Sequence, residues 1–443
     1  MQNSTTFDEF ESELKAAAGA FARETWEQLV AAESAGRPDV WMRKNGSAFL
    51  RQVLGRALTA RSERFTIQGP CSCGGLVEFR QRKPVTLHTI LPGRDVSVSA
   101  RNGGCATCGK GTFPLLVQLE IDAEGFTPEL RDLALLAATM EPYESAAEKL
   151  LGRFADVAVS RGKMSKLVAV RGEQAKSYLL QMSPPPPATD PDQRQHYAMM
   201  DGGMLHVDRR WQECKLATFF TADARAAVSK DRHVLTEKRV LGVRGSPEDL
   251  EKLIKKHAEV VTAATLPVVC LADGSPWIWN LFAELFPERV EILDWFHLDE
   301  HVAKTANILK GQGSEEAARW RALQLERFMH DEVEHVLEAL RFERRSTPSE
   351  SHQAAIDELE HYLTTHRHRV NYGTYRQRGL LIGSGAIESA ISHVAQQRMK
   401  RSGMRWSGKG ADAMLALRCI YRSTGHWENF LGAPTTIRAS VAA

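Results

Sequence analysis

The region between residues 196 and 298 constrains the fold most, because short apolar segments alternate there with amphipathic segments in a fixed order. We predict the order strand, strand, strand, helix, strand, helix, strand. The predicted strands are residues 198–207, 215–220, 239–243, 268–272 and 290–296. Short apolar strands between amphipathic helices are typical of a mixed α/β sheet.

Proline and charge divide the rest of the chain, whose 443 residues suffice for two to four domains. Four consecutive prolines, 184–187, indicate a stiff, extended linker. A charged stretch at 299–376, with helical periodicity and no strand signals, interrupts the α/β region, and we interpret it as an insertion. We predict a helical segment at 1–65, a β-rich module at 66–118, a helical segment at 119–182, the linker at 183–195, a core at 196–298, the helical insertion at 299–376 and the end of the core at 377–430.

Three acidic residues occupy positions where a carboxylate needs a partner. Asp201 lies inside an apolar strand, where burial of an unpaired charge is very unfavourable. Asp273 ends the strand 268–272, at the carboxyl edge where open α/β sheets bind ligands. Glu388 falls in the first turn of a helix that Ser384 would cap, near the positive end of the helix dipole. Each acid alone fits a structural role; their order along the chain is the informative feature.

With its flanking residues, this order resembles the DDE transposases of bacterial insertion sequences, ISKra type, which are related to Mutator-like transposases. The resemblance covers residues 196–430 well and the upstream region more loosely. The matching segments are MDGG at 200–203, LADGSPWIW at 271–279, LDWFH at 293–297, IGSGAIES at 382–389 and QRMKRSGMRW at 397–406.

The resemblance implies a ribonuclease-H-like core in which Asp201, Asp273 and Glu388 are the catalytic triad and hold two Mg²⁺ or Mn²⁺ ions. Two such ions, about 4 Å apart, stabilise the attacking and leaving oxygens of an in-line phosphoryl displacement. The resemblance also implies that the partner is double-stranded DNA, both the terminal inverted repeats of a transposon and a target. The expected activity is strand cleavage and strand transfer by a homodimer or higher oligomer on DNA.

Two further groups of residues adjoin the triad in the sequence. Asp294 and His297 form a D-x-x-H step, which we expect on the fifth strand in a structural role beside the metal ligands; binding of a third ion is the alternative. Seven Lys or Arg residues against one acid lie between 389 and 425, which favours DNA phosphate contact over a solvated face. The expected DNA-binding residues there are Arg398, Lys400, Arg401, Arg405, Trp406 and Lys409.

Two cysteine pairs bracket the β-rich module. They are Cys71 with Cys73 and Cys105 with Cys108. Two such knuckles joined by hairpins indicate a zinc ribbon, in which four thiolates surround a tetrahedral Zn²⁺ ion. The first pair is C-x-C rather than C-x-x-C, so incidental thiols or a site that has lost zinc remain the alternatives. The other cysteines, Cys214, Cys270 and Cys419, look like small core residues.

Residues 143–172 suggest a helix-turn-helix, with helices at 143–154 and 160–170. The second helix of such a motif enters the major groove of DNA, and it would present Arg161, Lys163 and Lys166 there. A plain helical pair is the alternative on the residues alone. The family resemblance favours DNA binding.

Composition argues against two classes of protein. No run approaches the ~18 apolar residues of a membrane helix. The first residues are polar and acidic, unlike a secretory signal, and seven cysteines do not suit a disulfide scaffold. We expect a cytoplasmic protein without a membrane partner, associated with the nucleoid when bound to DNA. Two other functions stay open: a metal-dependent nuclease without joining activity, and a DNA-binding protein with a decayed catalytic core.

Overall fold

The computed structural model describes residues 7–32, 36–65, 68–71, 73–93, 95–185, 195–229, 232–263, 266–346 and 348–433. The chain divides into two compact units, one of residues 1–170 with 431–443 and one of residues 171–430. Most of the expected linker at 183–195 lies outside the described residues. No helix in the described part of the chain has the length and apolar composition needed to cross a bilayer.

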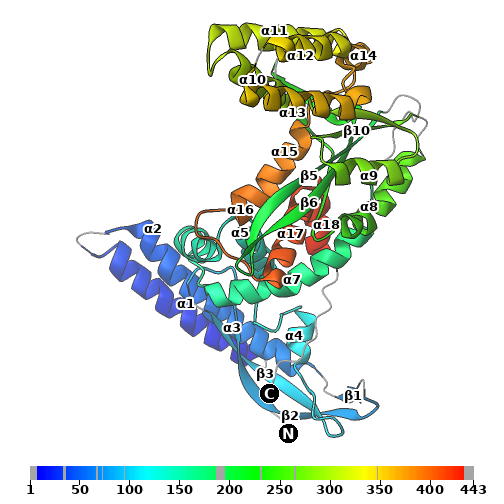
Figure 1. Ribbon diagram of the computed structural model, residues 1–443. Coiled ribbons are helices and arrows are strands. Elements are labelled where there is room, and N and C mark those ends of the chain that lie inside the picture. The colour runs from blue at the N-terminus through cyan, green and yellow to red at the C-terminus, as the bar shows by residue number, and fades with distance from the viewer. Residues whose placement is uncertain are drawn as a thin grey trace. The chain divides into compact units, whose positions relative to one another are not determined.

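The first unit is built from helices around a small antiparallel sheet (Figure 1). Its elements are α1 (Phe7–Leu29), α2 (Pro38–Trp41), η1 (Met42–Gly46), α3 (Ser47–Glu63), β1 (Gln68–Pro70), β2 (Leu76–Leu87), β3 (Val96–Cys105), β4 (Gly111–Thr112), α4 (Pro114–Gln118), α5 (Pro128–Met140), α6 (Tyr143–Ser145) and η2 (Ala146–Ala155), with α7 (Arg161–Gln181) shared between the two units.

The four strands follow one another in the order β1-β2-β3-β4. The sequence predicts two strands between 76 and 90, but β2 runs unbroken because its ladder with β3 continues through Pro84, which pairs with Ser99. Strand β1 pairs only with residues 76–78, so Pro84 lies on a free edge where its missing N–H costs no ladder bond. The dipeptide PG at 92–93 predicts a hairpin turn, and a turn with Gly93 at φ +98° joins β2 to β3.

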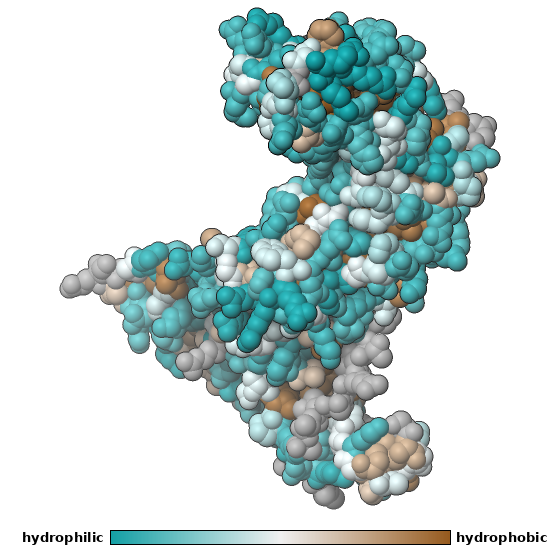
Figure 2. Space-filling view, in the orientation of Figure 1, coloured by the Kyte–Doolittle hydropathy of each residue, from teal (hydrophilic) through white to brown (hydrophobic). Residues whose placement is uncertain are grey.

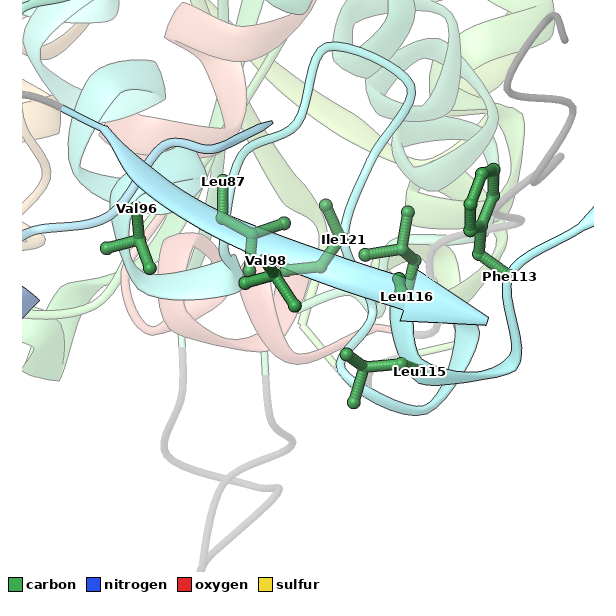
Figure 3. Packing of buried hydrophobic residues seen from close by; sticks show 8 residues of the cluster. Leu87, Val96, Val98, Phe113, Leu115, Leu116 and Ile121 are labelled. Carbon is green, nitrogen blue, oxygen red and sulfur yellow. The ribbon is translucent and has the colours of Figure 1, made fainter. Parts of the chain in front are cut away.

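The core of this unit lies between β3 and helix α3. Alternate residues of β3 point inward, Val96, Val98 and Ala100, and each is at most 1% exposed. They pack with Leu115 and with other side chains from the end of β2 and from α4 (Figure 3). Period-two burial on β3 therefore fixes which face of the hairpin the helices cover.

The expected helix-turn-helix segment is helical on both sides of a tight turn. Helix α6 continues directly into the π-helical η2, which ends at Asp156 in the left-handed conformation, φ +55°. Helix α7 follows but extends to Gln181, eleven residues (181 − 170) beyond the predicted end. The segment is thus a helix, a turn and a long second helix.

The second unit is a mixed α/β structure, as the alternation of strands and helices predicts. Its elements after α7 are β5 (His196–Val207), β6 (Arg210–Thr221), η4 (Ala222–Ala224), β7 (Arg225–Ser229), β8 (Arg232–Leu235), β9 (Arg239–Arg244), α8 (Pro247–Thr262), β10 (Val268–Ala272), α9 (Pro276–Leu285), β11 (Arg289–Leu293), α10 (Trp295–Lys310), α11 (Glu315–Met329), α12 (Val333–Ser346), α13 (Glu350–His366), η5 (Arg367–Arg369), α14 (Tyr372–Gln377), α15 (Gly385–Ile391), η6 (Ser392–Gln396), α16 (Gln397–Met399), α17 (Gly408–Arg422) and α18 (His426–Gly432), the last shared with the first unit.

A five-stranded sheet in the order β11-β10-β5-β6-β9 forms the centre of this unit. Strands β5, β6 and β9 are antiparallel neighbours, whereas β10 is parallel to both β5 and β11. Helix α15 packs on β5 and β6, while α8 and α17 pack on the β6–β9 side (Figure 1). The sheet is therefore covered by helices from sequence segments more than a hundred residues apart.

Five helices, α10 to α14, fill the interval between the last strand and α15. This region matches the expected helical insertion, except that α10 begins at Trp295. The fifth strand correspondingly ends at Leu293 rather than at residue 296 as predicted. Ion pairs such as Arg321–Asp299 and Lys304–Glu358 join the helices, whose outer surface is mostly hydrophilic (Figure 2).

Candidate functional site

Asp201 and Asp273 lie at the same level on neighbouring parallel strands. Leu271 of β10 pairs with Met199 of β5, and each aspartate follows two residues later (273 − 271 and 201 − 199). This register places Asp201, in the middle of β5, beside the carboxyl end of β10, which Asp273 directly follows. The structure thus unites two acids that are 72 residues apart in the sequence (273 − 201).

The carboxyl group of Asp201 is partly buried and sits among other charges. The backbone N–H of Gly202 donates a hydrogen bond to its Oδ1 over 2.6 Å. Burial, and to a smaller extent the charges of Asp273 and Glu388, raise the pKa of Asp201 to about 6, against the lowering effect of the Gly202 hydrogen bond. The charges of Asp273 and Glu388 thus both act on Asp201.

Asp273 is oriented by the turn that follows it. The amide of Ser275 donates to Oδ1 over 2.9 Å and the Ser275 hydroxyl donates to Oδ2 over 3.0 Å. Gly274 has φ +141°, and a Cβ there would lie 3.0 Å from the ring of Tyr362. Tyr362 belongs to α13 of the helical insertion, so the insertion packs directly against the turn that holds Asp273.

Glu388 projects from the first turn of α15 and is exposed. The sequence predicts that Ser384 caps this helix through its side chain. The structure instead directs the Ser384 hydroxyl to Oε1 of Glu388, over 2.7 Å, and no side-chain hydrogen bond caps the helix. Ser384 is thus a partner of the glutamate rather than of the backbone.

Asp294 and His297 do not lie on the fifth strand as predicted; Asp294 caps α10 and His297 lies in its first turn. Oδ2 of Asp294 accepts hydrogen bonds from the backbone and Nδ1 of His297, over 2.9 and 2.7 Å. Its Oδ1 accepts from the amide of Ser384 over 2.6 Å. Asp294 is fully buried, so its side chain ties the end of β11 to the segment that leads into Glu388.

The hydrogen bond that His297 donates to Asp294 also sets the charge of His297. It is the main reason why the pKa of His297 rises to about 9, with burial acting in the opposite direction. One ligand atom from each of Asp294, His297 and Glu388 lies within 4.8 Å of the others. Among the described residues, Asp201 and Asp273 belong to no such group. A cationic imidazole attracts Glu388, whereas the carboxylates repel one another.

These side chains are ligands suited to divalent cations. Carboxylate oxygens suit Mg²⁺ and Mn²⁺, and Nε2 of His297 would become a metal ligand only after loss of its proton. A cavity of about 550 Å³ adjoins them. Its lining includes Asp201, Phe296, His297, Glu300, Glu388, Ser389, Ser392, His393 and Gln396. Phe296 and His393 are site residues that the sequence did not single out, although Phe296 stands inside the D-x-x-H step.

The four cysteines of the β-rich module converge as predicted. One sulfur from each lies within 4.8 Å of the others, with 3.6 Å between Cys71 and Cys108 and between Cys73 and Cys105. Thiolates ~2.3 Å from a tetrahedral zinc ion lie roughly 3.8 Å apart. The group therefore could hold zinc, and the irregular C-x-C spacing of the first pair does not prevent convergence.

Backbone amides around the cysteines favour thiolates. An N–H of Cys108 is the main cause that lowers the pKa of Cys105 to about 6. An N–H of Cys73 acts in the same way on Cys71 and lowers its pKa. At Cys73 the amide of Gly75 acts in the same direction, but hydrogen bonds with the other three thiols outweigh it and raise the pKa to about 11. The low pKa values of Cys71 and Cys105 favour the deprotonated form that metal ions bind. The other three cysteines are fully buried, as expected for core residues.

Arg398 and Trp406 of the basic tail contact each other. Arg398 is only 1% exposed and lies 5.2 Å from the ring centroid of Trp406. The indole N–H of Trp406 donates to the carbonyl of Met399 over 2.9 Å. These contacts contradict the prediction that Arg398 binds DNA phosphates, because its guanidinium is not accessible. The remaining predicted contacts in the tail are exposed: Lys400, Arg401, Arg405 and Lys409.

The three basic residues on α7, the second helix of the expected helix-turn-helix segment, differ in their surroundings. Arg161 is exposed. Lys163 instead donates to the carbonyl of Glu124 over 3.3 Å and Lys166 pairs with the Glu124 carboxylate over 3.1 Å. Of the three residues that we predict to contact DNA, Arg161 is thus exposed, whereas both lysines bind Glu124.

The chain was compared with profiles of protein families and with curated proteins, and neither comparison found a match.

Proposed function

We propose that the protein is a DDE-type transposase that cuts DNA and joins the cut strand to a target in a divalent-metal-dependent reaction. The observation that supports this most is the register of β5 and β10, which puts Asp201 beside the carboxyl end of β10, where Asp273 follows. The charge of Glu388 acts on the same site. Three acids from distant parts of the chain suit a phosphoryl-transfer centre.

In this proposal the second unit is a ribonuclease-H-like core interrupted by the insertion α10–α14. Asp201, Asp273 and Glu388 would hold two Mg²⁺ or Mn²⁺ ions. When bound, such ions supply Lewis-acid stabilisation of the attacking and leaving oxygens. The protein's own residues orient the ligands: Ser275 holds Asp273, and Ser384 holds Glu388.

The first unit would recognise the ends of the mobile element. A zinc ion held by the four cysteines would fix the hairpin β2–β3, and Arg161 of α7 would reach DNA. The exposed basic residues after Glu388 would contact phosphates near the cut. Because both ends of an element must be cut and joined together, the working form would be a dimer or a higher oligomer on DNA.

The test begins with duplexes that tile the DNA on both sides of the coding region, incubated with purified protein and Mg²⁺ or Mn²⁺. We expect cleavage at discrete positions and, with pre-cut ends, transfer to a target duplex. Asp201→Asn should abolish both reactions while retaining DNA binding, because Lys and Arg supply most of the affinity. Asp223→Asn, an exposed aspartate of η4, is the matched control.

Each remaining outcome selects one alternative. Cleavage without transfer of pre-cut ends would identify a nuclease. DNA binding without cleavage by wild-type protein would identify a DNA-binding protein whose catalytic core has decayed. Equal cleavage by the Asp201→Asn variant and the wild type would exclude the acid site.

A further inference from the structure

The cavity beside Glu388 has an exposed aromatic ring on one side. Phe296 is 58% exposed, although it is a large apolar side chain in the first turn of a helix. Its neighbours on the chain are fixed, since Asp294 caps the helix and His297 bonds to that aspartate. An exposed phenylalanine held at the mouth of a polar cavity requires an explanation.

The orientation of the ring is set by Gly383. A Cβ at this position would lie 2.9 Å from the Phe296 ring, so only a glycine lets the ring lie against the backbone there. The ring thus has a closely packed support on one side and leaves its other face open. Such a rigid aromatic face is well suited to stacking.

One helical segment adds polar side chains to the lining of the cavity, beside the apolar Ile391. Ser392 and His393 belong to the π-helical η6, and Gln396 ends it. Single π-helical turns inside α-helices occur frequently at functional sites. Nδ1 of His393 bonds to the carbonyl of Ser389 over 2.7 Å, so in the neutral ring Nε2 is the acceptor.

Together these walls present a stacking face and hydrogen-bonding groups of both kinds. A nucleobase has the complementary features, a π face and an edge with donors and acceptors. The volume of about 550 Å³ falls in the range of ~300–1,000 Å³ for ligand pockets. Asp201 and Glu388 share the lining, so a base bound there would belong to a nucleotide next to the phosphate that reacts.

Three tryptophans of this unit are engaged elsewhere. Trp279 is 5% exposed, and the ring of Trp295 meets Tyr372 at a centroid distance of 4.9 Å. The Trp406 indole bonds to the Met399 carbonyl. Phe296 is the aromatic residue that combines exposure with a place in the lining of this cavity.

We infer that this cavity is a nucleobase subsite: it takes one unpaired base flanking the scissile phosphate, stacked on Phe296 with its edge toward Ser392, His393 and Gln396. The inference rests on the proposed function and specifies its substrate as DNA with a base displaced from the duplex. Enzymes that act inside duplexes commonly displace a base in this way, and stacking offsets part of the cost of unpairing.

The experiment tests whether the effect of the Phe296 ring on cleavage depends on the presence of the flanking base. Phe296→Ala should slow cleavage of intact duplex about 5- to 100-fold, the effect of losing one base stack. Phe296→Trp should cleave at nearly the wild-type rate. On duplexes in which the flanking nucleotide is made abasic, the Phe296→Ala variant and the wild type should cleave equally fast, because no base remains to stack.

Phe342→Ala is the matched control, since Phe342 is 62% exposed on α12 and does not line the cavity. A second readout does not need cleavage. Duplexes with 5-iododeoxyuridine at successive positions around the cut should photo-crosslink to residue 296 in the wild type and not in Phe296→Ala.

Two results would overturn the subsite. One is equal cleavage by Phe296→Ala and Phe342→Ala; the other is a Phe296→Ala defect of the same size on intact and abasic duplexes, which would mean a structural role. If wild-type protein cuts no duplex, the proposed function fails. The crosslink then decides the subsite separately, and its absence would remove the subsite as well.

Discussion

The Ser384 hydroxyl donates a hydrogen bond to Oε1 of Glu388 over 2.7 Å, while its amide donates to Asp294 over 2.6 Å. The serine therefore connects the buried carboxylate at the end of β11 with the exposed carboxylate on α15. This relay positions Glu388 without touching any substrate.

Ser384→Ala should weaken Mn²⁺ binding about 10- to 100-fold, the usual effect of removing a partner that orients a metal ligand. The melting temperature should change little, since the lost bond involves an exposed glutamate. Isothermal titration with Mn²⁺ measures the affinity, and Ser351→Ala, an exposed serine of α13, is the control. Unchanged affinity would mean that Glu388 needs no orienting partner.

The cysteine group should hold one zinc ion per chain. Cys105→Ser should lose the metal and disorder the hairpin β2–β3, because coordination energy is folding energy in small metal modules. Metal analysis of the purified protein and hydrogen exchange of residues 76–105 measure the two effects. Cys270→Ala, which removes a buried core thiol, should keep its zinc. Wild-type protein purified without zinc, yet folded in this module, would contradict the prediction.

The exposed and the buried basic residues after Glu388 should behave differently. Replacing Lys400, Arg401 and Arg405 with Ala should reduce the slope of log K against log salt by about 0.9 for each phosphate that is no longer neutralised. Arg398→Met should leave the slope unchanged but lower the unfolding free energy by about 1–2 kcal/mol, because it removes a buried cation–π interaction. A salt slope that falls in Arg398→Met alone would reverse this assignment.

His257 should make the second unit less stable in mild acid. Burial, reinforced by the charge of Arg239, lowers its pKa from 6.5 to about 4. The unfolded chain therefore takes up a proton below about pH 6.5 that the folded chain takes up only near pH 4. The stability from this residue is complete above pH 6.5 and falls by about 3 kcal/mol as the pH drops to 4.

Urea unfolding of the wild type and of His257→Phe at pH 7 and pH 5 measures this effect. The variant should lose less stability between the two pH values, because phenylalanine binds no proton. His361→Gln, at an exposed histidine of α13, should follow the wild type. A variant with the wild-type pH dependence would show that other groups dominate.

Apolar runs with clear ends were predictable from the sequence. Strand β10 matches its prediction because five buried residues lie between Pro267 and Asp273. The end of β11 was not, because Trp295 and Phe296 continue the apolar run. The strand ends because the backbone N–H of His297 donates a hydrogen bond to the side chain of Asp294. The spacing of apolar residues does not reveal such a bond.

The candidate site, like the fold, was predictable from the sequence only in part. The strand pattern predicted a sheet in which β5, with Asp201, and β10, which precedes Asp273, became parallel neighbours. The order of the acids did not predict that Glu388 lies within 4.8 Å of Asp294 and His297. Ser384 and Arg398 were misassigned, because side-chain direction decides both roles. For Arg398 a signal existed: it falls four residues after Val394, on the buried face of the helix. Charge alone predicted a solvent-facing position, whereas helical spacing predicted a buried one.

The helical insertion also delays the synthesis of Glu388 relative to the rest of the site. The four cysteines are all present once residue 108 has been made, whereas Glu388 follows 280 residues later (388 − 108). At about 5–20 residues per second, this interval lasts roughly 14–56 s. Over the last 115 residues of that interval (388 − 273) the nascent chain carries both aspartates without the glutamate. A ribosome that stops inside α10–α14 releases a protein with the cysteine module but without the acid on α15, so premature termination yields a chain that lacks the complete centre.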